Sequence, residues 1–405
     1  MQNELEADVI ILGGGLVGLT LALALDVHGL SSVVVDPADP EAILAPGFDG
    51  RASAIASASW KMLDAIGIGA RLAGKGCEIR DIHVTDGLAP GLLAFESAAD
   101  EGPLGYMFEN RHVRQALHAA AAESANVTLL MKTRAVETHR DAHGVTATLS
   151  DGRTARAALL VAAEGRQSPT REAAGIKVAR WQYDHVAIVG ALEHEKPHGN
   201  IAYEIFYPEG PFALLPMPPG NRSAIVWSVS REHAPAMMKL GERAFVAEAE
   251  KKMGGLLGKL KSIAPRSGYP LGFHHASRLT AERLVLVGDA GHGIHPIAGQ
   301  GLNLGLRDVA ALAEVLVEGS RLGLDLGDAQ ILDRYARWRG LDTLMVAGAT
   351  DAFTRLFGVP GKAASAARRL GLGVVQRTPA LKRFFMQEAR GETGALPHLL
   401  QGELV

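Results

Sequence analysis

The stretch with the most distinctive residue types is GDAGHGIHPIAGQGLNLGLRDVAALAE, residues 288–314. It contains six glycines, two histidines and one proline, and its second half has the composition of a regular helix. Glycine lets a ligand approach the backbone closely, and the first turn of a helix offers free N–H groups to an anion. The stretch therefore predicts that an anionic ligand meets the chain where a helix begins, near Gly301.

A second glycine-rich stretch, ADVIILGGGLVGLTLALALDVHGLSSVVVDP, occupies residues 7–37. Residues 9–12 are apolar without alternation, which is typical of a buried parallel strand, and residues 16–27 predict a helix. The segment SSVVVD predicts a second buried strand that ends at Asp36. Strand, glycine turn, helix and strand in this order are typical of a dinucleotide site, and the pattern does not distinguish NAD from FAD.

The glycines of this stretch form the pattern G-x-G-x-x-G, in which each has a separate task. Gly13 allows the tight turn, Gly15 allows a pyrophosphate to approach the backbone, and Gly18 lets the helix pack against the strand. Asp36 lies 18 positions after Gly18, close to the spacing of about 20 at which an acidic residue accepts hydrogen bonds from a ribose. These residues predict where the nucleotide half of a cofactor binds.

Composition narrows the class of protein. The chain has 405 residues, of which 47% are hydrophobic and 21% charged, a balance typical of a globular protein with more than one domain. The net charge of −3 does not favour nucleic acid as a partner. Cys77 is the single cysteine, so an intrachain disulfide is excluded and a reducing compartment is favoured. No group of cysteine, histidine and carboxylate residues has the spacing of a metal site.

Two further units place an acidic residue and a glycine directly after a buried strand. In ALLVAAEGRQSPTREAAGI, residues 158–176, the apolar run 159–162 leads to Glu164 and Gly165. In the third unit the apolar run 284–287 leads to Gly288 and Asp289, and the stretch described first follows. The three units are far apart in the chain, so a domain built from them must be discontinuous.

Together the three units resemble the FAD-dependent aromatic monooxygenases with the hydroxybenzoate-hydroxylase fold. Within that group the chain is most similar to the ubiquinone-biosynthesis hydroxylases. This likeness covers nearly the whole chain and rests on APGFDGRASAIASASWKMLDAIGI (45–68), ENRHVRQAL (109–117), HPIAGQGLNLGLRDVAALAE (295–314) and LKRFFMQEARG (381–391). The resemblance implies an α/β fold with α+β elements: a Rossmann-like FAD-binding domain, a discontinuous antiparallel β-sheet substrate domain and a C-terminal helical segment.

The resemblance also implies which residues bind FAD. The first loop and Asp36 bind the ADP half, and Asp289 binds the ribityl chain. Glu164 and Gly165 stand where the family has an Asp-Gly motif that lies near the pyrophosphate and is linked to the use of NAD(P)H; the glutamate keeps the charge and lengthens the side chain by one carbon. The residues implied to face the isoalloxazine are Pro296, Gly299, Gly301, Leu302 and Asn303.

Two arginines and two histidines allow more than one interpretation. By resemblance, Arg51 and Arg114 contact the pyrophosphate or the flavin, and an arginine among small residues suits an anionic partner. The competing interpretation is a surface ion pair between Arg51 and Asp49. His292 and His295 could act as acid or base, but we favour a structural role in the loop because flavin-dependent hydroxylation needs no protein base there.

The scattered motifs predict a discontinuous arrangement of domains. We expect an FAD-binding domain over 1–75, 103–180 and 265–345, a substrate domain over 76–102 and 181–264, and a C-terminal helical region over 346–405. Alternating apolar runs in the second of these predict a hairpin followed by antiparallel strands. Apolar side chains of this sheet are candidates for the wall of a substrate pocket, although a place in the core of the sheet competes for each: Phe206, Phe212, Leu214 and, from the flavin loop, Pro296.

The function implied by the resemblance is hydroxylation of the aromatic ring of a polyprenylated phenol in ubiquinone biosynthesis. FAD would be bound non-covalently, NAD(P)H would reduce it transiently, and O₂ would add at the flavin C4a to give the hydroperoxyflavin that delivers oxygen. No catalytic protein residue is predicted. Two other functions stay open: a flavin-dependent reductase on the same fold, and a non-catalytic FAD-bound subunit of a quinone-biosynthesis complex.

The C-terminal segment 345–390 differs in charge from the rest of the chain. Its net charge is +6, against −9 for the remainder, and apolar residues interleave the cations. This pattern fits either helices that cap the FAD domain or a basic amphipathic face for an anionic membrane surface or a quinone-biosynthesis complex. We therefore expect a cytoplasmic protein, with peripheral contact to the inner membrane face as the alternative. The basic residues are Arg355, Lys362, Arg368, Arg369, Arg377, Lys382, Arg383 and Arg390.

Overall fold

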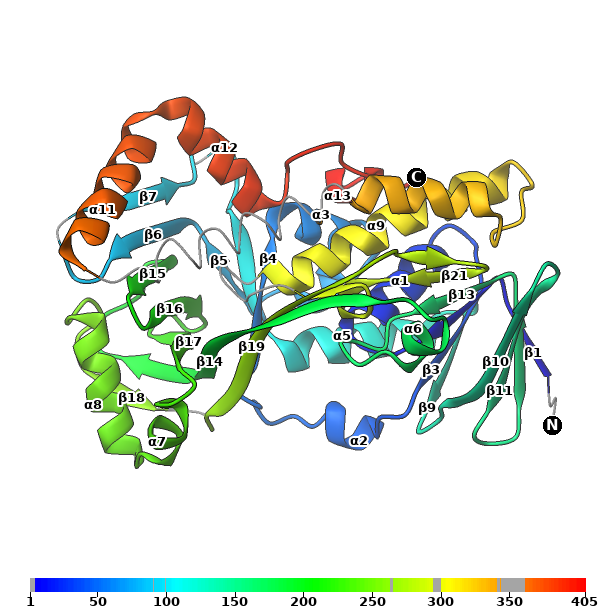
Figure 1. The fold of residues 1–405 in the computed structure, drawn as a ribbon, viewed down its shortest axis with the longest axis horizontal. Coiled ribbons are helices and arrows are strands. Elements are labelled where there is room, and N and C mark those ends of the chain that lie inside the picture. The colour runs from blue at the N-terminus through cyan, green and yellow to red at the C-terminus, as the bar shows by residue number, and fades with distance from the viewer. Residues whose placement is uncertain are drawn as a thin grey trace.

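A computed structural model describes residues 4–89, 91–98, 100–262, 265–293, 300–340, 343 and 361–405. One half of the molecule is built on a six-stranded sheet in the order β20-β21-β13-β2-β3-β9, parallel except for the edge strand β20 (Figure 1). Its strands are β2 (Val9–Leu12), β3 (Ser32–Asp36), β9 (Val127–Met131), β13 (Leu159–Ala162), β20 (Thr280–Ala281) and β21 (Leu284–Leu286).

This sheet is the middle of three layers. Side chains alternate along a strand, so Val9 and Ile11 pack against helices while Ile10 and Leu12 pack against a second sheet. The helices are α1 (Leu16–Asp26), α5 (Asn110–Glu123) and α9 (Gln300–Arg321). The second sheet contains β1 (Glu4–Glu6), β10 (Ala135–Asp141), β11 (Gly144–Leu149) and β12 (Thr154–Ala157). Burial on both faces is why the predicted strands lack polar alternation.

The other half is built on a nine-stranded mixed sheet. The order along it is β22-β19-β14-β17-β16-β15-β6-β7, with β18 paired to β14. The predicted hairpin is confirmed as β6 and β7, and the predicted antiparallel strands are confirmed, with β17 and β16 lying between β14 and β15. The strands are β6 (Asp81–Asp86), β7 (Leu93–Glu96), β14 (Val178–His194), β15 (Ile201–Tyr207), β16 (Gly210–Met217), β17 (Arg222–Ser230), β18 (Leu260–Ser262), β19 (Ser267–Ala276) and β22 (His292–Gly293).

The two faces of the nine-stranded sheet have different neighbours. On one face, α7 (Ala234–Lys239) and α8 (Glu242–Met253) cover a core centred on Phe212 and Trp227. The other face packs on a three-stranded sheet that belongs with the FAD half. This small sheet consists of β4 (Ala52–Ala56), β5 (Gly76–Ile79) and β8 (Gly105–Glu109). In the chain, α2 (Pro40–Ile43) precedes β4, while α3 (Ser57–Ala65) and α4 (Gly69–Leu72) lie between β4 and β5.

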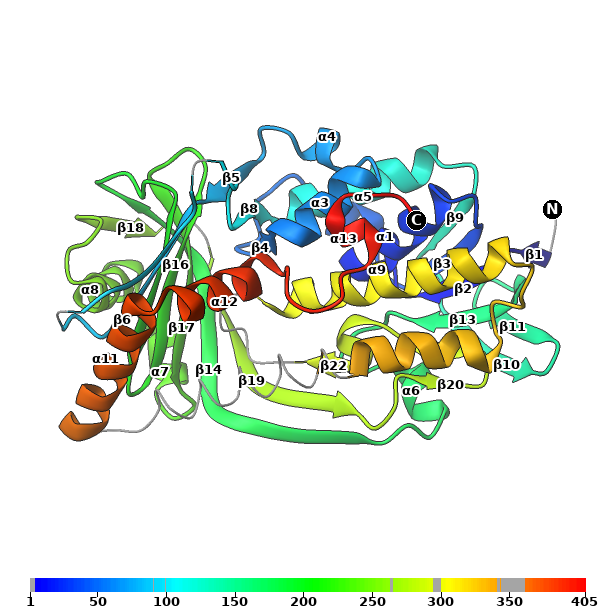
Figure 2. The same cartoon turned by 90° about the horizontal axis from the view of Figure 1, so that it is seen from above.

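Two long strands connect the halves. β14 begins near α6 (Pro169–Ala173) in the six-stranded half and runs into the middle of the nine-stranded sheet, and β19 returns antiparallel to it (Figure 2). β22 pairs with the far end of β19. The loop after β21 is therefore hydrogen-bonded to the same sheet that carries the predicted pocket strands.

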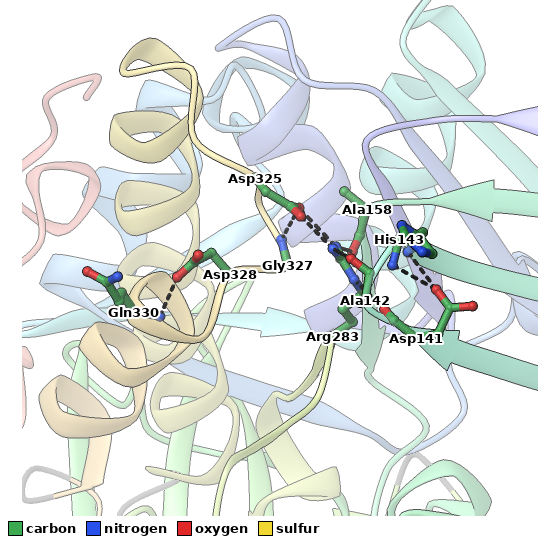
Figure 3. A network of polar contacts seen from close by, with 10 residues as sticks. Asp141, Ala142, His143, Ala158, Arg283, Asp325, Gly327, Asp328 and Gln330 are labelled. Atoms are coloured by element: carbon green, nitrogen blue, oxygen red, sulfur yellow. Dashed lines mark hydrogen bonds and ion pairs between the residues drawn. The ribbon is translucent and has the colours of Figure 1, made fainter.

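Arg283 holds the opposite end of the six-stranded half together. It is 6% exposed and donates to the carbonyl oxygens of Asp141, Ala142 and Ala158 at 2.7, 2.6 and 2.8 Å, and to the carboxylate of Asp325 (Figure 3). A guanidinium can fill this place because it has five donors in a fixed plane. One side chain thus ties β10–β11, β13 and the loop after α9 to each other.

The C-terminal residues lead from the edge of the nine-stranded sheet back to the FAD half. α11 (Lys362–Arg377) and α12 (Pro379–Arg390) lie along β6 and β7, whereas α13 (His398–Gln401) packs beside α3 and α9 (Figure 2). Arg307 of α9 donates to the carbonyl oxygens of Gly391 and Thr393 at 3.1 and 2.9 Å. Within the described ranges no helix combines the length and the apolar character needed to cross a bilayer. The predicted α/β fold class with C-terminal helices is confirmed.

Candidate cofactor site

The first glycine loop connects β2 to α1. A Cβ on Gly13 would lie 2.3 Å from the carbonyl oxygen of Ala163, and a Cβ on Gly18 would lie 1.9 Å from that of Gly13. Both positions therefore need glycine for packing. A Cβ on Gly15 would meet no atom within 4 Å, and α1 begins there without a side-chain cap or an acidic residue in its first turn. Open space in front of uncapped N–H groups suits an anion.

Asp36 lies at the end of β3, beside this loop. Its Oδ2 accepts a hydrogen bond from the Gly14 N–H at 2.6 Å, and its Oδ1 accepts one from the Ala38 N–H at 2.7 Å. The carboxylate is thus held in one orientation by backbone donors. Each carboxylate oxygen has a second lone pair, so Asp36 can still accept from a ribose hydroxyl.

The Glu164 side chain accepts hydrogen bonds from its own loop. Its Oε2 accepts from the Ser168 hydroxyl at 2.6 Å and from the Thr170 N–H at 3.2 Å, which caps the start of α6. The longer arm of glutamate allows this local contact. Gly165 follows with φ of +78°, a backbone conformation that glycine adopts without strain.

Arg171 joins the second loop to the third. Its side chain is fully buried, and it donates to the carbonyl oxygens of Ala290 at 2.9 Å and Arg166 at 3.1 Å. No role for Arg171 was predicted, because residues 165–172 are mostly polar or charged and give no local sign that one cation among them is buried.

Asp289 occupies the turn after β21. Part of its surface is exposed to solvent, but many protein atoms surround the carboxyl. This partial removal from water raises the pKa of the carboxyl, and the nearby Arg166 and His292 oppose the rise. Below it, His274 donates from Nε2 to the Asp289 carbonyl oxygen at 2.7 Å. Burial lowers the pKa of His274 to about 4, so this ring is neutral at physiological pH.

A buried network supports the third loop from α9. Asp308 is fully buried; it accepts from the Gly288 N–H at 2.8 Å, from His292 Nε2 at 2.5 Å and from Arg339 Nε at 2.7 Å. These partners lower the pKa of the Asp308 carboxyl against the effect of burial. His292 therefore has the structural role that the sequence favoured, while His295 lies outside the described residues.

Asn303 fixes the start of α9 against β4. Its side-chain Oδ1 accepts from the Ala56 N–H, and its Nδ2 donates to the Ala54 carbonyl oxygen, both at 2.9 Å. Both ends of this side-chain amide are therefore bonded to β4. Gly301 faces open space, and Leu302 lies partly buried against the helical layer. Pro296 and Gly299 lie outside the described residues.

The two predicted arginines meet Asp49 in an unexpected way. Arg114 Nη2 donates to Asp49 Oδ2 at 2.8 Å, while Oδ1 accepts from the backbone N–H of Arg51 at 3.0 Å. The Arg51 side chain instead donates from Nε to the Tyr269 hydroxyl at 2.9 Å. The competing Arg51–Asp49 ion pair is therefore not formed by the side chains, and Asp49 pairs with Arg114 instead. Arg114 Nε is buried and has no partner within the described part of the chain, which is consistent with a ligand at this point.

The apolar residues predicted for the pocket are divided between the two faces of the sheet. Phe212 and Leu214 point into the core under α8, with Trp227 and Phe245 as neighbours. This core packing buries both side chains completely or nearly so. Phe206 is on the alternate face, because its register partner is Pro211 and it is offset by one residue from Ile205.

The observed groups fit FAD. β21, β13, β2 and β3 are parallel neighbours, so the loops after them meet at one edge of the sheet. There the open start of α1 suits the pyrophosphate, Asp36 suits a ribose, and Asp289 suits the hydroxyls of a ribityl chain. FAD supplies two-electron redox chemistry and activation of O₂.

Comparison with known proteins gives the family. Residues 6–341 match the family model described as "FAD binding domain". The chain is 49% identical to "Ubiquinone hydroxylase UbiL" of Rhodospirillum rubrum, over 95% of this chain and 90% of that protein. It is 33% identical to "3-demethoxyubiquinol 3-hydroxylase" of Escherichia coli, over 96% of this chain and all of that protein.

Among solved structures, p-nitrophenol 4-monooxygenase PnpA of Pseudomonas putida superposes with a TM-score of 0.79 at 19% identity, covering 98% of this chain and all of that one. At this identity the likeness concerns the fold. The relatives and the family model agree with the motifs, the loop geometry and the fit to FAD. The chain therefore belongs to the FAD-dependent monooxygenases, within the hydroxylases of ubiquinone biosynthesis.

Proposed function

We propose that this protein hydroxylates the aromatic ring of a polyprenylated phenol, with NAD(P)H as the reductant and O₂ as the oxygen source. The observation that carries the proposal is the meeting of three loops at one sheet edge, with the open start of α1 next to Asp36 and with Asp289 two strands away. FAD bound there is the group that activates O₂. The names of the two relatives, a ubiquinone hydroxylase and a demethoxyubiquinol hydroxylase, support the substrate class.

The residues of the chain bind and orient. Gly13, Gly15 and Gly18 let the pyrophosphate approach the start of α1. The partial positive charge of this helix N-terminus stabilises the negative phosphates. Asp36 and Asp289 accept hydrogen bonds from the ribose and ribityl hydroxyls. The first-turn N–H groups of α9, from Gly301 onward, stabilise negative charge on the reduced flavin.

The test is product formation. The purified protein is mixed with NADH or NADPH, O₂ and a phenol that carries a short, water-compatible prenyl chain, and products are separated by chromatography and mass spectrometry. We expect a product heavier by one oxygen atom, with ¹⁸O incorporated from ¹⁸O₂. NAD(P)H oxidation without any hydroxylated product would favour a reductase, and no NAD(P)H oxidation would favour a non-catalytic subunit.

We further propose that α11 and α12 bring the protein to an anionic membrane surface. Four apolar side chains of these helices are exposed, with Leu370 at 72%, Val374 and Phe384 at 49% and Leu381 at 41%. Two exposed cations, Arg377 and Arg383, accompany them. Apolar and basic side chains on one surface suit a lipid bilayer with anionic headgroups. A substrate with a long prenyl tail is found in such a membrane.

A further inference from the structure

The carboxyl of Glu204 lies in apolar surroundings and has no role in the function proposed above. It lies on β15 between its register partners, Val84 of β6 and Ala213 of β16. Residues two positions apart on a strand share a face, so Ala202 and Phe206 flank it. All four neighbours are apolar. Such a place is costly for a carboxylate, because water or a hydrogen-bond donor would otherwise stabilise its charge.

No charged group in the described part of the chain compensates Glu204. Within the described ranges no hydrogen-bond donor or cation contacts its carboxyl. The charged groups of the packed elements have partners of their own: Asp86 of β6 pairs with Arg368 of α11 at 3.0 Å, and Glu96 of β7 pairs with Lys382 of α12 at 3.7 Å. β16 has no titratable side chain. Burial by itself raises the pKa of Glu204 to about 7.

The face that carries Glu204 packs on the FAD half at Ala202 and on α11 at Val84. Ala202, its neighbour on this face, packs in one cluster with Ala52 and Ala54 of β4. The side chain of Asn303 binds β4 to the start of α9. Glu204 is two residues along β15 from that cluster, a rise of about 7 Å. Its side chain is half-buried, so a ligand can reach the carboxyl.

We propose that the Glu204 carboxylate accepts the proton of the phenolic hydroxyl of the substrate. The inference rests on the proposed function, since it assigns a base to that reaction. As the proton moves to Glu204, the electron pair of the O–H bond stays on the phenol oxygen and increases the electron density of the ring. An electron-rich ring carbon then bonds to one oxygen atom of O₂ as the O–O bond breaks. The other oxygen atom leaves as water, and NAD(P)H supplies the two electrons for this reduction.

The proton balance closes within the same site. When the ring carbon takes up oxygen, the electron pair on the phenol oxygen becomes the carbonyl bond of a dienone. Loss of the ring C–H proton to water restores aromaticity, and Glu204 returns its proton to the phenol oxygen. A base that titrates near neutral pH is suited to accept and return a proton at physiological pH.

The first test is Glu204→Gln, which keeps volume and removes the proton acceptor. We expect the kcat for hydroxylation to fall about 10²- to 10⁴-fold, while FAD content stays at the wild-type value. In wild type kcat/KM should rise with pH through about 7, because the carboxylate is the active form, and the variant should lack this rise. Glu204→Asp should restore part of it. The control is Glu209→Gln, on the turn after β15, where Glu209 is exposed and pairs with Lys252.

A second measurement does not depend on activity. Infrared difference spectra of the FAD-loaded protein between pH 5.5 and pH 8.5 should show the carbonyl stretch of one protonated carboxylic acid that disappears near pH 7 and is missing in Glu204→Gln. If wild type hydroxylates phenols and Glu204→Gln keeps its rate and pH profile, the assignment of the base is wrong and the proposed function stands. If wild type hydroxylates no phenol, the proposed function fails, whatever the infrared spectra show.

Discussion

At the scale of single residues, three carboxylates lie at the ends of three strands of the six-stranded sheet and have three different environments. Asp36 is oriented by backbone donors, Glu164 caps the next helix, and Asp289 is exposed among many protein atoms. Position after a strand therefore does not determine what an acidic residue does. The donors that reach each carboxylate decide whether it serves the fold or a ligand.

Asp289→Ala should weaken FAD binding. Loss of a charged acceptor for the ribityl hydroxyls should cost about 1.5–3 kcal/mol, which is about 10- to 150-fold in Kd. Fluorescence titration of apoprotein with FAD measures this loss. Asp328→Ala is the matched control, because Asp328 is an exposed helix-cap residue after α9. Asp49 is unsuitable as a control since it holds Arg114. Equal affinities for the Asp289 and Asp328 variants would contradict the assignment.

His274 should make stability depend on pH. Burial holds its folded-state pKa at about 4, whereas in the unfolded chain it is about 6.5. The unfolded state therefore binds a proton first as the pH falls, and the folded state loses stability between pH 6.5 and pH 4. In wild type this loss should exceed that of His274→Gln by at most about 3 kcal/mol. Urea unfolding at pH 7.5 and pH 4.5 measures it.

The control for this experiment is His143→Gln. His143 is exposed in the turn after β10, and within the described residues only its backbone N–H forms a hydrogen bond. Its replacement should therefore leave the pH dependence of the unfolding free energy unchanged. Glutamine at 274 can still donate to the Asp289 carbonyl oxygen, which keeps the loop anchored while removing the titration. Parallel curves for wild type and His274→Gln would show that other groups cause the acid sensitivity.

At the scale of elements, α9 forms buried hydrogen bonds to three neighbouring segments. Asn303 attaches its first turn to β4, Asp308 attaches its middle to the loop after β21, and Arg307 attaches it to the residues after α12. Each of these polar side chains is buried in a helix that otherwise packs with apolar residues. The helix start is therefore presented to the cofactor from a fixed position.

Asp308→Ala should destabilise the fold strongly. The substitution removes the buried carboxylate that accepts from Arg339 Nε and His292 Nε2, and breaking a buried pair in this way costs about 3–5 kcal/mol. The control on the same helix is Glu318→Ala, where an exposed pair with Arg334 is lost at a cost of about 0–1 kcal/mol. The free energy of unfolding in urea separates the two. Similar losses for both variants would refute the importance of the buried network.

At the scale of the whole molecule, the cations of the C-terminal segment do not form one surface. Arg368 is buried in an ion pair with Asp86, and Arg390 is buried against Glu101. Arg377 and Arg383 remain exposed, beside the apolar side chains of α11 and α12. The net charge of the segment thus overstates the charge available to a membrane.

Replacement of Leu370, Val374 and Phe384 by serine should reduce binding to anionic vesicles. Each exposed side chain loses the burial that a bilayer offers, and an exposed arginine contributes about 1 kcal/mol at low salt. Co-sedimentation with vesicles of phosphatidylglycerol and phosphatidylcholine at low and high salt measures binding. Arg377→Gln with Arg383→Gln should reduce the salt-dependent part, and FAD content should not change. No binding of wild type at low salt would disprove the membrane proposal.

The sequence by itself determined the parts of this protein that depend on local pattern. Unbroken apolar runs identified the parallel strands, glycine spacing identified the loop before α1, and the motifs identified the family and its cofactor. These features are readable because a buried strand and a tight turn each restrict the residues that can occupy them.

Only the tertiary structure decided which side chains share a face or a partner. Phe206 and Phe212 look alike in sequence, yet the alternation of β15 and β16 and the pairing between them put them on opposite faces. Asp308, Arg171 and His274 gained their roles from residues 15 to 119 positions away. Glu204 has its place because β6, β15 and β16 bring apolar neighbours around it. Strand register and long-range burial are set by the packing of distant segments, which no local pattern contains.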